Sequence, residues 1–180
     1  MTSAPIGITI TKLEMTSRPS LRPVLPHGQD TGRVMLLKLK HPPVHFYRYL
    51  YESVGKPHVW VERRRLSDDA LAETVQHDQV DIYVLYCDGA PAGYFELDFR
   101  SPPSAGLAYF GLIPDFIGRG LGSFLLATAI ATAWDRRIER LWVHTNTLDH
   151  PRALPLYQKM GFVPYAQEKS SITPIDEPSL

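Results

Sequence analysis

One segment constrains this chain more than any other, because an apolar run leads through three alternating glycines into a second apolar run. The segment reads Tyr109-Phe-Gly-Leu-Ile-Pro-Asp-Phe-Ile-Gly-Arg-Gly-Leu-Gly-Ser123. It predicts a strand, a tight turn and the start of a helix, since glycine adopts backbone angles that other residues avoid. The first N–H groups of a helix lack partners within the helix, and the helix dipole attracts negative charge. The segment therefore predicts a binding loop for phosphate or pyrophosphate.

Two familiar phosphate-binding motifs do not fit this loop. A Walker A motif ends in Gly-Lys followed by Ser or Thr, and the loop contains no lysine. A dinucleotide fingerprint needs a third glycine where Ser123 stands. It also needs an acidic residue at the end of the next strand, which the segment 141–146 lacks. A glycine-rich turn that only joins a strand to a helix is the simplest alternative.

The loop resembles the coenzyme A loop of the GNAT N-acetyltransferases, which is usually written Arg/Gln-x-x-Gly-x-Gly/Ala. Residues 117–122 fit this frame except at its first position, where Ile117 replaces the usual Gln or Arg. The difference concerns one polar contact and leaves the backbone turn intact. The loop thus favours coenzyme A over other phosphate ligands.

A second segment is similar to another signature of the same family. His150-Pro-Arg-Ala-Leu-Pro-Leu-Tyr-Gln-Lys-Met-Gly-Phe162 matches Asn-x-x-Ala-x-x-Leu/Phe-Tyr-x-x-x-Gly-Phe at every position but the Asn. The pattern predicts a short helix with Pro151 at its first position and Gly161 in the left-handed conformation after its end. Taken alone, Tyr157 is more simply a core aromatic. Two signatures in the right order favour the family, and the resemblance is specific over residues 81–169.

The order of the expected elements is that of an α/β protein. Strands are expected at 8–15, 34–40, 82–87, 92–100, 106–113, 140–146 and 162–169, and helices at 43–54, 67–77, 120–136 and around Tyr157. The first two strands are candidates for a hairpin. The resemblance implies the GNAT fold, a mixed, mostly antiparallel, twisted sheet of about six to seven strands flanked by about four helices. Residues 1–170 are expected to form one domain, and 171–180 a loose tail.

Composition excludes several classes of function. Nineteen basic and nineteen acidic residues cancel, so no net field would draw the chain to nucleic acid or to an anionic membrane. The longest apolar run, 125–134, is too short for a membrane span, and the N-terminus lacks a signal-peptide pattern, which favours the cytoplasm. Cys87 is the single cysteine and is expected to be a buried core residue. The seven histidines show no metal-ligand spacing, so we expect no metal.

The resemblance implies that acetyl-CoA is the cosubstrate and that the two signature segments bind it. Cofactor contacts are expected from the end of the strand, the glycine loop and the short helix: Leu112, Ile113, Ile117, Gly118, Arg119, Gly120, Leu121, Gly122, Ser123, His150, Ala153 and Tyr157. The backbone N–H groups near Leu112 and Ile113 are expected to hold the oxyanion of the reaction. Tyr157 resembles the tyrosine acid that protonates the departing thiolate. His150, in the Asn position, is expected to cap the helix, with cofactor contact or proton relay as alternatives.

Acyl transfer to an amine also requires a group that accepts the amine proton, because an alkylamine has a pKa near 10. The family often places this base on the strand before the cofactor-binding one, where Glu96 lies. We favour Glu96, with His144 acting through water as the alternative. The alternative without a catalytic role is that Glu96 is a solvated charge on an open face of the sheet.

The acceptor is the least constrained part of the prediction. In GNAT-like folds the corresponding helical region shapes the acceptor pocket, and here it combines aromatic and cationic side chains that include Tyr47, Arg48, Trp60 and Arg64. Arg48 or Arg64 would suit an acceptor with a carboxylate or phosphate, whereas surface arginines beside a packed aromatic cluster are the simpler interpretation. The sequence therefore predicts transfer of acetyl from acetyl-CoA to a primary amine of a small molecule or peptide, by direct attack in a ternary complex. A non-catalytic acyl-CoA-binding module, a different acyl group and a homodimer all stay open.

Overall fold

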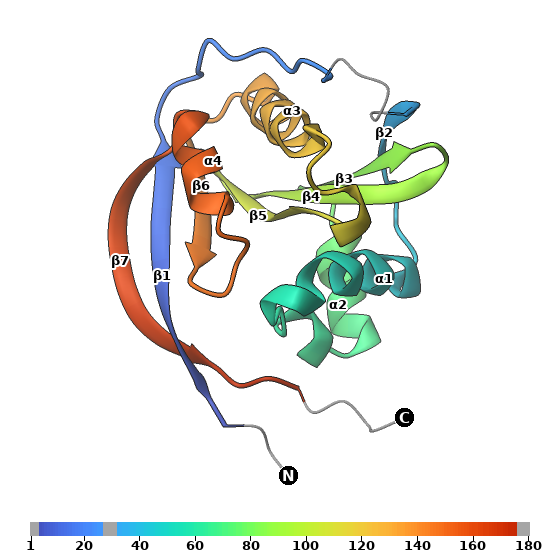
Figure 1. Cartoon of the computed structure of the whole chain (residues 1–180), viewed down its shortest axis with the longest axis vertical. Helices are drawn as coiled ribbons and strands as arrows, with labels where there is room; N and C mark the ends of the chain where they lie inside the picture. The colour runs from blue at the N-terminus through green and yellow to red at the C-terminus, as the bar shows by residue number, and fades with distance from the viewer. Residues whose placement is uncertain (1–3, 27–31, 176–180) are drawn as a thin grey trace.

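The computed structural model describes residues 4–26 and 32–175, which form one seven-stranded sheet with helices on both faces (Figure 1). The strands are β1 (Ile6–Met15), β2 (Val34–Lys38), β3 (Val80–Cys87), β4 (Ala90–Ser101), β5 (Ser104–Leu112), β6 (Arg140–Asn146) and β7 (Val163–Ile172). The helices are α1 (Val44–Gly55), α2 (Asp68–Val75), α3 (Leu121–Asp135) and α4 (Ala153–Lys159), with short turns of 3-10 helix at Lys56–His58, Arg63–Arg65 and Pro114–Phe116. The predicted mixed α/β fold is confirmed. No helix in the described part of the chain is long and apolar enough to cross a membrane.

Each face of the sheet has its own core. Helices α3 and α4 pack on one face, where Leu125, Leu141 and Tyr157 belong to one cluster of buried residues. Helices α1 and α2 cover the other face, where Tyr47 and Leu71 belong to a second cluster. In Figure 1 the two helix layers lie above and below the sheet. A ligand that passes through the sheet would therefore meet both helix layers.

The sheet is interrupted at its centre, between β5 and β6. These two strands are parallel, and they pair only where Ser104–Gly106 faces Arg140–Trp142. All other neighbouring strands pair in antiparallel fashion, each over five or more residues. Beyond residues 106 and 142 the strands separate, which leaves backbone groups without sheet partners along both.

The N-terminal strand corrects one expectation from the sequence. Strand β1 does not form a hairpin with β2, because β1 lies between β6 and β7, whereas β2 forms the opposite edge beside β3 (Figure 1). The buried side chains Leu13 and Met15 place β1 in the core under α3. The tail also begins later than predicted, since β7 continues to Ile172, and residues 176–180 lie outside the described residues.

Local signals in the sequence account for several element ends. Ser67 caps α2, and its Oγ accepts the N–H of Ala70 at 3.2 Å. Gly161 has a φ of 103°, as expected for the left-handed residue after α4. Pro151, however, lies before the helix, because α4 begins at Ala153. The chain turns through residues 151–152 before it becomes helical.

Candidate active site

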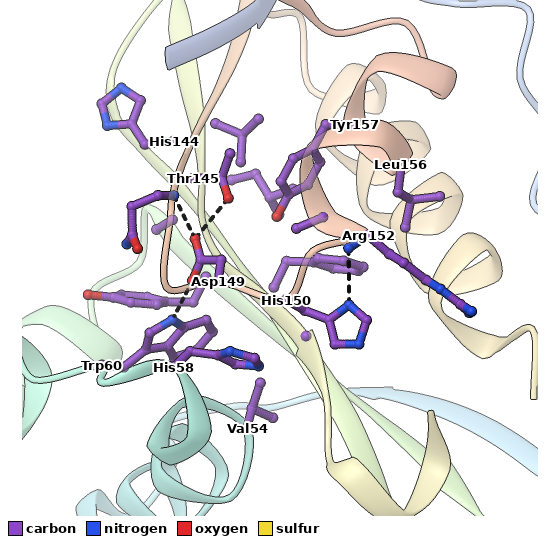
Figure 2. A pocket seen from close by; sticks show the side chains of 18 of the residues that line it. Val54, His58, Trp60, His144, Thr145, Asp149, His150, Arg152, Leu156 and Tyr157 are labelled. Atoms are coloured by element: carbon purple, nitrogen blue, oxygen red, sulfur yellow. Dashed lines mark hydrogen bonds between the residues drawn. The ribbon is translucent and has the colours of Figure 1, made fainter. Parts of the chain in front are cut away.

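A cavity of about 350 Å³ fills the space where β5 and β6 separate. Both strands line it, as do Leu156 and Tyr157 of α4 on one face of the sheet and Val54, His58 and Trp60 on the other (Figure 2). The cavity thus reaches both helix layers through the gap in the sheet. This arrangement lets two ligands meet from opposite faces.

The glycine loop forms the start of α3 beside this cavity. Gly118 and Gly120 have φ values of 90° and 76°, a region that disfavours side chains, and Gly120 is the N-cap of α3. No side chain caps the helix, so the N–H groups of its first turn have no side-chain partner there. A Cβ added at Gly120 would lie 3.0 Å from Cβ of Pro26. The loop has the geometry predicted for an anion site, and Ile117 connects it to the cavity lining.

The two predicted oxyanion donors differ in their availability. The N–H of Ile113 donates to the carbonyl of Ala92 at 2.9 Å, so the sheet already uses it. Successive residues of a strand direct their N–H groups to opposite sides, so that of Leu112 points toward the gap beside β6. Leu112 also lines the cavity. The expectation for Ile113 is therefore corrected, and Leu112 is the available donor.

Tyr157 extends from α4 into the cavity lining (Figure 2). Its ring is only 5% exposed and packs edge-on against Phe110 and Phe162, with centroids 6.0 Å and 5.8 Å away. Burial raises the pKa of the phenol far above its ordinary value of about 10, and the charge of Asp149 adds to the shift. The hydroxyl therefore stays protonated near neutral pH, as an acid must be before it reacts, while the same burial opposes release of its proton.

A loop that the sequence did not single out connects the two sides of the cavity. Asp149 follows β6, and its carboxylate accepts hydrogen bonds from Thr145 Oγ1 at 2.8 Å and from the N–H of Asn146 at 2.9 Å. The indole N–H of Trp60 donates to the same carboxylate at 3.1 Å (Figure 2). An aspartate in the short turn after a predicted strand was the available signal. Asp149 holds the β6–α4 loop against the segment after α1.

His150 does not cap α4 as expected, because its side chain bonds the turn before the helix rather than the first turn of the helix. Its Nδ1 accepts the backbone N–H of Arg152 at 3.2 Å, which stabilises the turn that precedes α4 (Figure 2). Arg152 is the N-cap residue, and no side chain bonds the helix end there. His150 and Ala153 both line the cavity, so contact with a cofactor stays a prediction.

The structure places Glu96 neither at the cavity, as expected for a catalytic base, nor on an open face of the sheet. Its side chain is 0% exposed, so it is not a solvated charge. One carboxylate oxygen accepts the Tyr47 hydroxyl at 2.5 Å, and the other pairs with Nη2 of Arg63 at 2.5 Å. Burial raises the pKa of the Glu96 carboxyl, while the Arg63 charge and the Tyr47 hydrogen bond oppose this rise. Glu96 is not among the residues that line the cavity.

Arg63 links this buried carboxylate to the cavity wall. Its guanidinium lies 5.2 Å from the ring centroid of Tyr109, and Tyr109 lines the cavity. Glu96 therefore holds Arg63 in place, and Arg63 in turn packs against the cavity-lining ring of Tyr109. The helix α1 covers this face of the sheet, which is why the carboxylate is enclosed.

His144, the alternative proton acceptor, does line the cavity. It lies on β6 next to Thr145, so its side chain faces the opposite side of the sheet from Thr145. The ring is exposed and packs against Trp142 at 4.8 Å. Partial burial and the nearby charge of Lys12 lower its pKa below the ordinary value, so the ring is neutral near pH 7. A neutral imidazole is able to accept a proton.

Of the four predicted acceptor contacts, only Trp60 lines the cavity. Tyr47 is fully buried against Glu96. Arg48 donates to the carboxylate of Asp68 and to the carbonyl of Leu66, both at 2.8 Å, and Arg64 pairs with Glu52 at 3.6 Å. The arginines lie outside the lining because acids of their own helical layer hold them.

The same face supplies two residues that the sequence did not identify. His58 lines the cavity, and its Nδ1 lies 3.1 Å from the carbonyl of Leu148, so that nitrogen carries the proton. Glu62 also lines the cavity, is exposed, and accepts the Tyr51 hydroxyl at 3.1 Å. Neither residue belongs to a motif, and only the fold of the segment after α1 brings them to the cavity.

Comparison with known proteins decides the family. The family model described as Acetyltransferase (GNAT) family matches residues 46–162, which is more than half of the chain. The chain belongs to the GNAT acetyltransferase family. Among solved GNAT structures, the GCN5-related N-acetyltransferase of Kribbella flavida has a TM-score of 0.59 and 16% identity, over 95% of this chain and 61% of that one. An aminoglycoside acetyltransferase from a soil metagenome has a TM-score of 0.58 and 12% identity, over 71% of this chain and 87% of that one.

A curated relative in this family matches a shorter stretch. The mycothiol acetyltransferase of Acidothermus cellulolyticus is 38% identical over 71 residues, which is 39% of this chain and 20% of that protein. The chain thus matches only one fifth of this relative and spans less than two thirds of the Kribbella structure. At these identities the structural likenesses show the GNAT fold alone. The reaction of this chain has to be inferred from the residues of its own cavity.

Proposed function

We propose that this protein transfers an acetyl group from acetyl-CoA to a primary amine of a small molecule, by direct attack in a ternary complex. One observation carries the proposal: the parallel strands β5 and β6 separate beside the glycine loop, and the cavity between them, which Leu112 lines, reaches both faces of the sheet. The two relatives named for mycothiol and aminoglycoside acetyltransfer support a small-molecule acceptor.

The residues that would hold acetyl-CoA lie on the α3/α4 face of the gap. The backbone of residues 119–123 would bind the pyrophosphate, because the first turn of α3 presents N–H groups and the positive end of the helix dipole. The unpaired edges of β5 and β6 would bind the pantetheine amides in place of the missing strand pairing. Ala153 and Leu156 line the same side, and their apolar side chains suit the pantetheine chain.

The acceptor would enter from the α1 face and lose its proton to His144, directly or through a water. The neutral amine nitrogen then attacks the thioester carbon, and the N–H of Leu112 stabilises the oxyanion. One such donor is typically worth about 3 to 4 kcal/mol. When the C–S bond breaks, Tyr157 donates its proton to the thiolate, so the products are the acetylated amine and coenzyme A. The nitrogen loses its second proton to the Tyr157 phenolate through water, and His144 releases the first proton to solvent, which restores the enzyme.

A thiol-release assay with acetyl-CoA and a panel of amines tests this function. We expect release of coenzyme A that depends on the acceptor, with the acetylated amine detected by mass spectrometry. Binding of acetyl-CoA without acceptor-dependent release would support the non-catalytic alternative instead. Faster release from propionyl-CoA than from acetyl-CoA would show that the acyl group is a different one.

A further inference from the structure

We propose that the acceptor is a small dication, an amine that carries a second positively charged group, and that Glu62 binds this second group. The inference rests on the proposed function, because it concerns the acceptor side of the same cavity. It names the chemical class of the acceptor and a residue that selects it.

The charges of the acceptor side are all acidic. The charged residues that line the whole cavity are Glu62, Asp149 and Arg152. Arg152 is the N-cap of α4 and lies on the other helix layer. The lining histidines on the acceptor side are His58 and His144, and His144 is neutral near pH 7. An acceptor therefore meets carboxylates and no cationic side chain of the lining.

Only one of these two carboxylates is available to a ligand. Asp149 is occupied by Thr145, the N–H of Asn146 and Trp60. Glu62 receives one hydrogen bond, from the Tyr51 hydroxyl to Oε2, and within residues 4–26 and 32–175 its Oε1 has no hydrogen bond or ion pair. Tyr51 is buried and fixes the orientation of the Glu62 side chain. The result is an exposed carboxylate held at the cavity.

Aromatic rings beside Glu62 add to the attraction for a cation. Trp60 and Tyr109 both line the cavity, and their ring centroids are 5.2 Å apart. The Arg63 guanidinium already lies over the Tyr109 ring, so the indole of Trp60 is the one of these two rings left for an acceptor cation. Aromatic faces attract ammonium groups, most strongly where water is excluded. Their apolar area also suits the carbon chain between two charged groups.

The reacting amine itself is a poor partner for Glu62. A nearby carboxylate raises the pKa of an amine, whereas attack on the thioester requires the neutral form. The negative charge therefore serves a group that stays charged during the reaction. An acceptor with an anionic tail is disfavoured, because Arg48 and Arg64 lie outside the lining and the tail would face Glu62.

Three acceptors of similar length but different tail charge test the proposal: putrescine, butylamine and γ-aminobutyrate. The full chain is first saturated with coenzyme A, and the binding of each amine is then measured by calorimetry. We expect putrescine to bind about tenfold more tightly than butylamine, in the range of a hydrogen bond to a charged group, and γ-aminobutyrate to bind most weakly. Glu62→Gln should abolish the preference for putrescine and leave coenzyme A binding unchanged.

Glu73→Gln serves as the matched control, because Glu73 is an exposed glutamate of α2 outside the cavity lining. It removes the same charge and should keep the preference for putrescine. Equal binding of putrescine and butylamine, binding of neither, or a preference that survives in the Glu62→Gln variant would overturn the dication proposal while coenzyme A still binds. Failure of coenzyme A itself to bind would overturn the proposed function as well, so the two failures are distinguishable.

Discussion

The buried pair of Glu96 and Arg63 gives the most quantitative prediction for this protein. The substitution Glu96→Gln keeps the shape of the side chain but leaves the Arg63 guanidinium, whose side chain is 14% exposed, without its counter-charge. The Nε of Arg63 is already buried and has no hydrogen-bond partner among the described residues. Removing one member of a buried ion pair costs about 3 to 5 kcal/mol of unfolding free energy. For a chain of this size each kcal/mol lowers Tm by about 2 to 4 °C, so we expect a decrease of about 6 to 20 °C.

A double-mutant cycle separates the ion pair from other effects of the substitution. Arg63→Met removes the charge that Glu96→Gln leaves uncompensated, so the double variant should be more stable than Glu96→Gln alone. Thermal and urea unfolding of the four proteins measure the coupling free energy. A Glu96→Gln variant with an unchanged Tm would refute the reasoning, since the guanidinium would then have found another way to be solvated.

The same variant tests whether Glu96 is the catalytic base. If Glu96 only supports the Tyr109 wall, kcat per folded molecule should change little, and KM for the acceptor should increase because Arg63 no longer holds the ring in place. A loss of about a hundredfold in kcat in a fully folded variant would instead identify Glu96 as the proton acceptor.

Three further predictions concern the cofactor and the proton transfers. Tyr157→Phe should keep stability and coenzyme A affinity but lower kcat at every accessible pH, because burial holds the phenol protonated throughout; full activity in steady-state assays would contradict the acid role. Gly120→Val should greatly weaken coenzyme A binding measured by calorimetry, since its φ of 76° and the nearby Pro26 leave no room for a side chain; unchanged affinity would refute the pyrophosphate site. The neutral ring of His144 is the form that accepts a proton, so kcat/KM should rise with pH and then level off. The midpoint of this rise should lie below the ordinary histidine pKa of about 6.5, and His144→Gln should abolish the rise. A limb that persists in His144→Gln would contradict the role of His144 as the proton acceptor.

The sequence by itself determined the features that depend on neighbouring residues. Gly118 and Gly120 specified the backbone of the glycine loop, because glycine adopts these φ values without strain. Ser67 specified the start of α2 through a hydrogen bond three residues along the chain. The two signature segments carried the family and the position of Tyr157. All of these are interactions within a few residues, so the linear order of side chains is enough to encode them.

The tertiary structure alone decided which distant residues meet. Glu96 and Arg63 are 33 positions apart, and a carboxylate on a strand has the same local pattern whether solvent or a helix covers it. The insertion of β1 between β6 and β7 likewise depends on long-range strand pairing that periodicity does not specify. Ile113 lost its predicted role because the register of β4 and β5 uses its N–H. Glu62 reached the cavity because the chain after α1 folds back over the sheet. These outcomes follow from packing and strand register, which arise only when the whole chain is assembled.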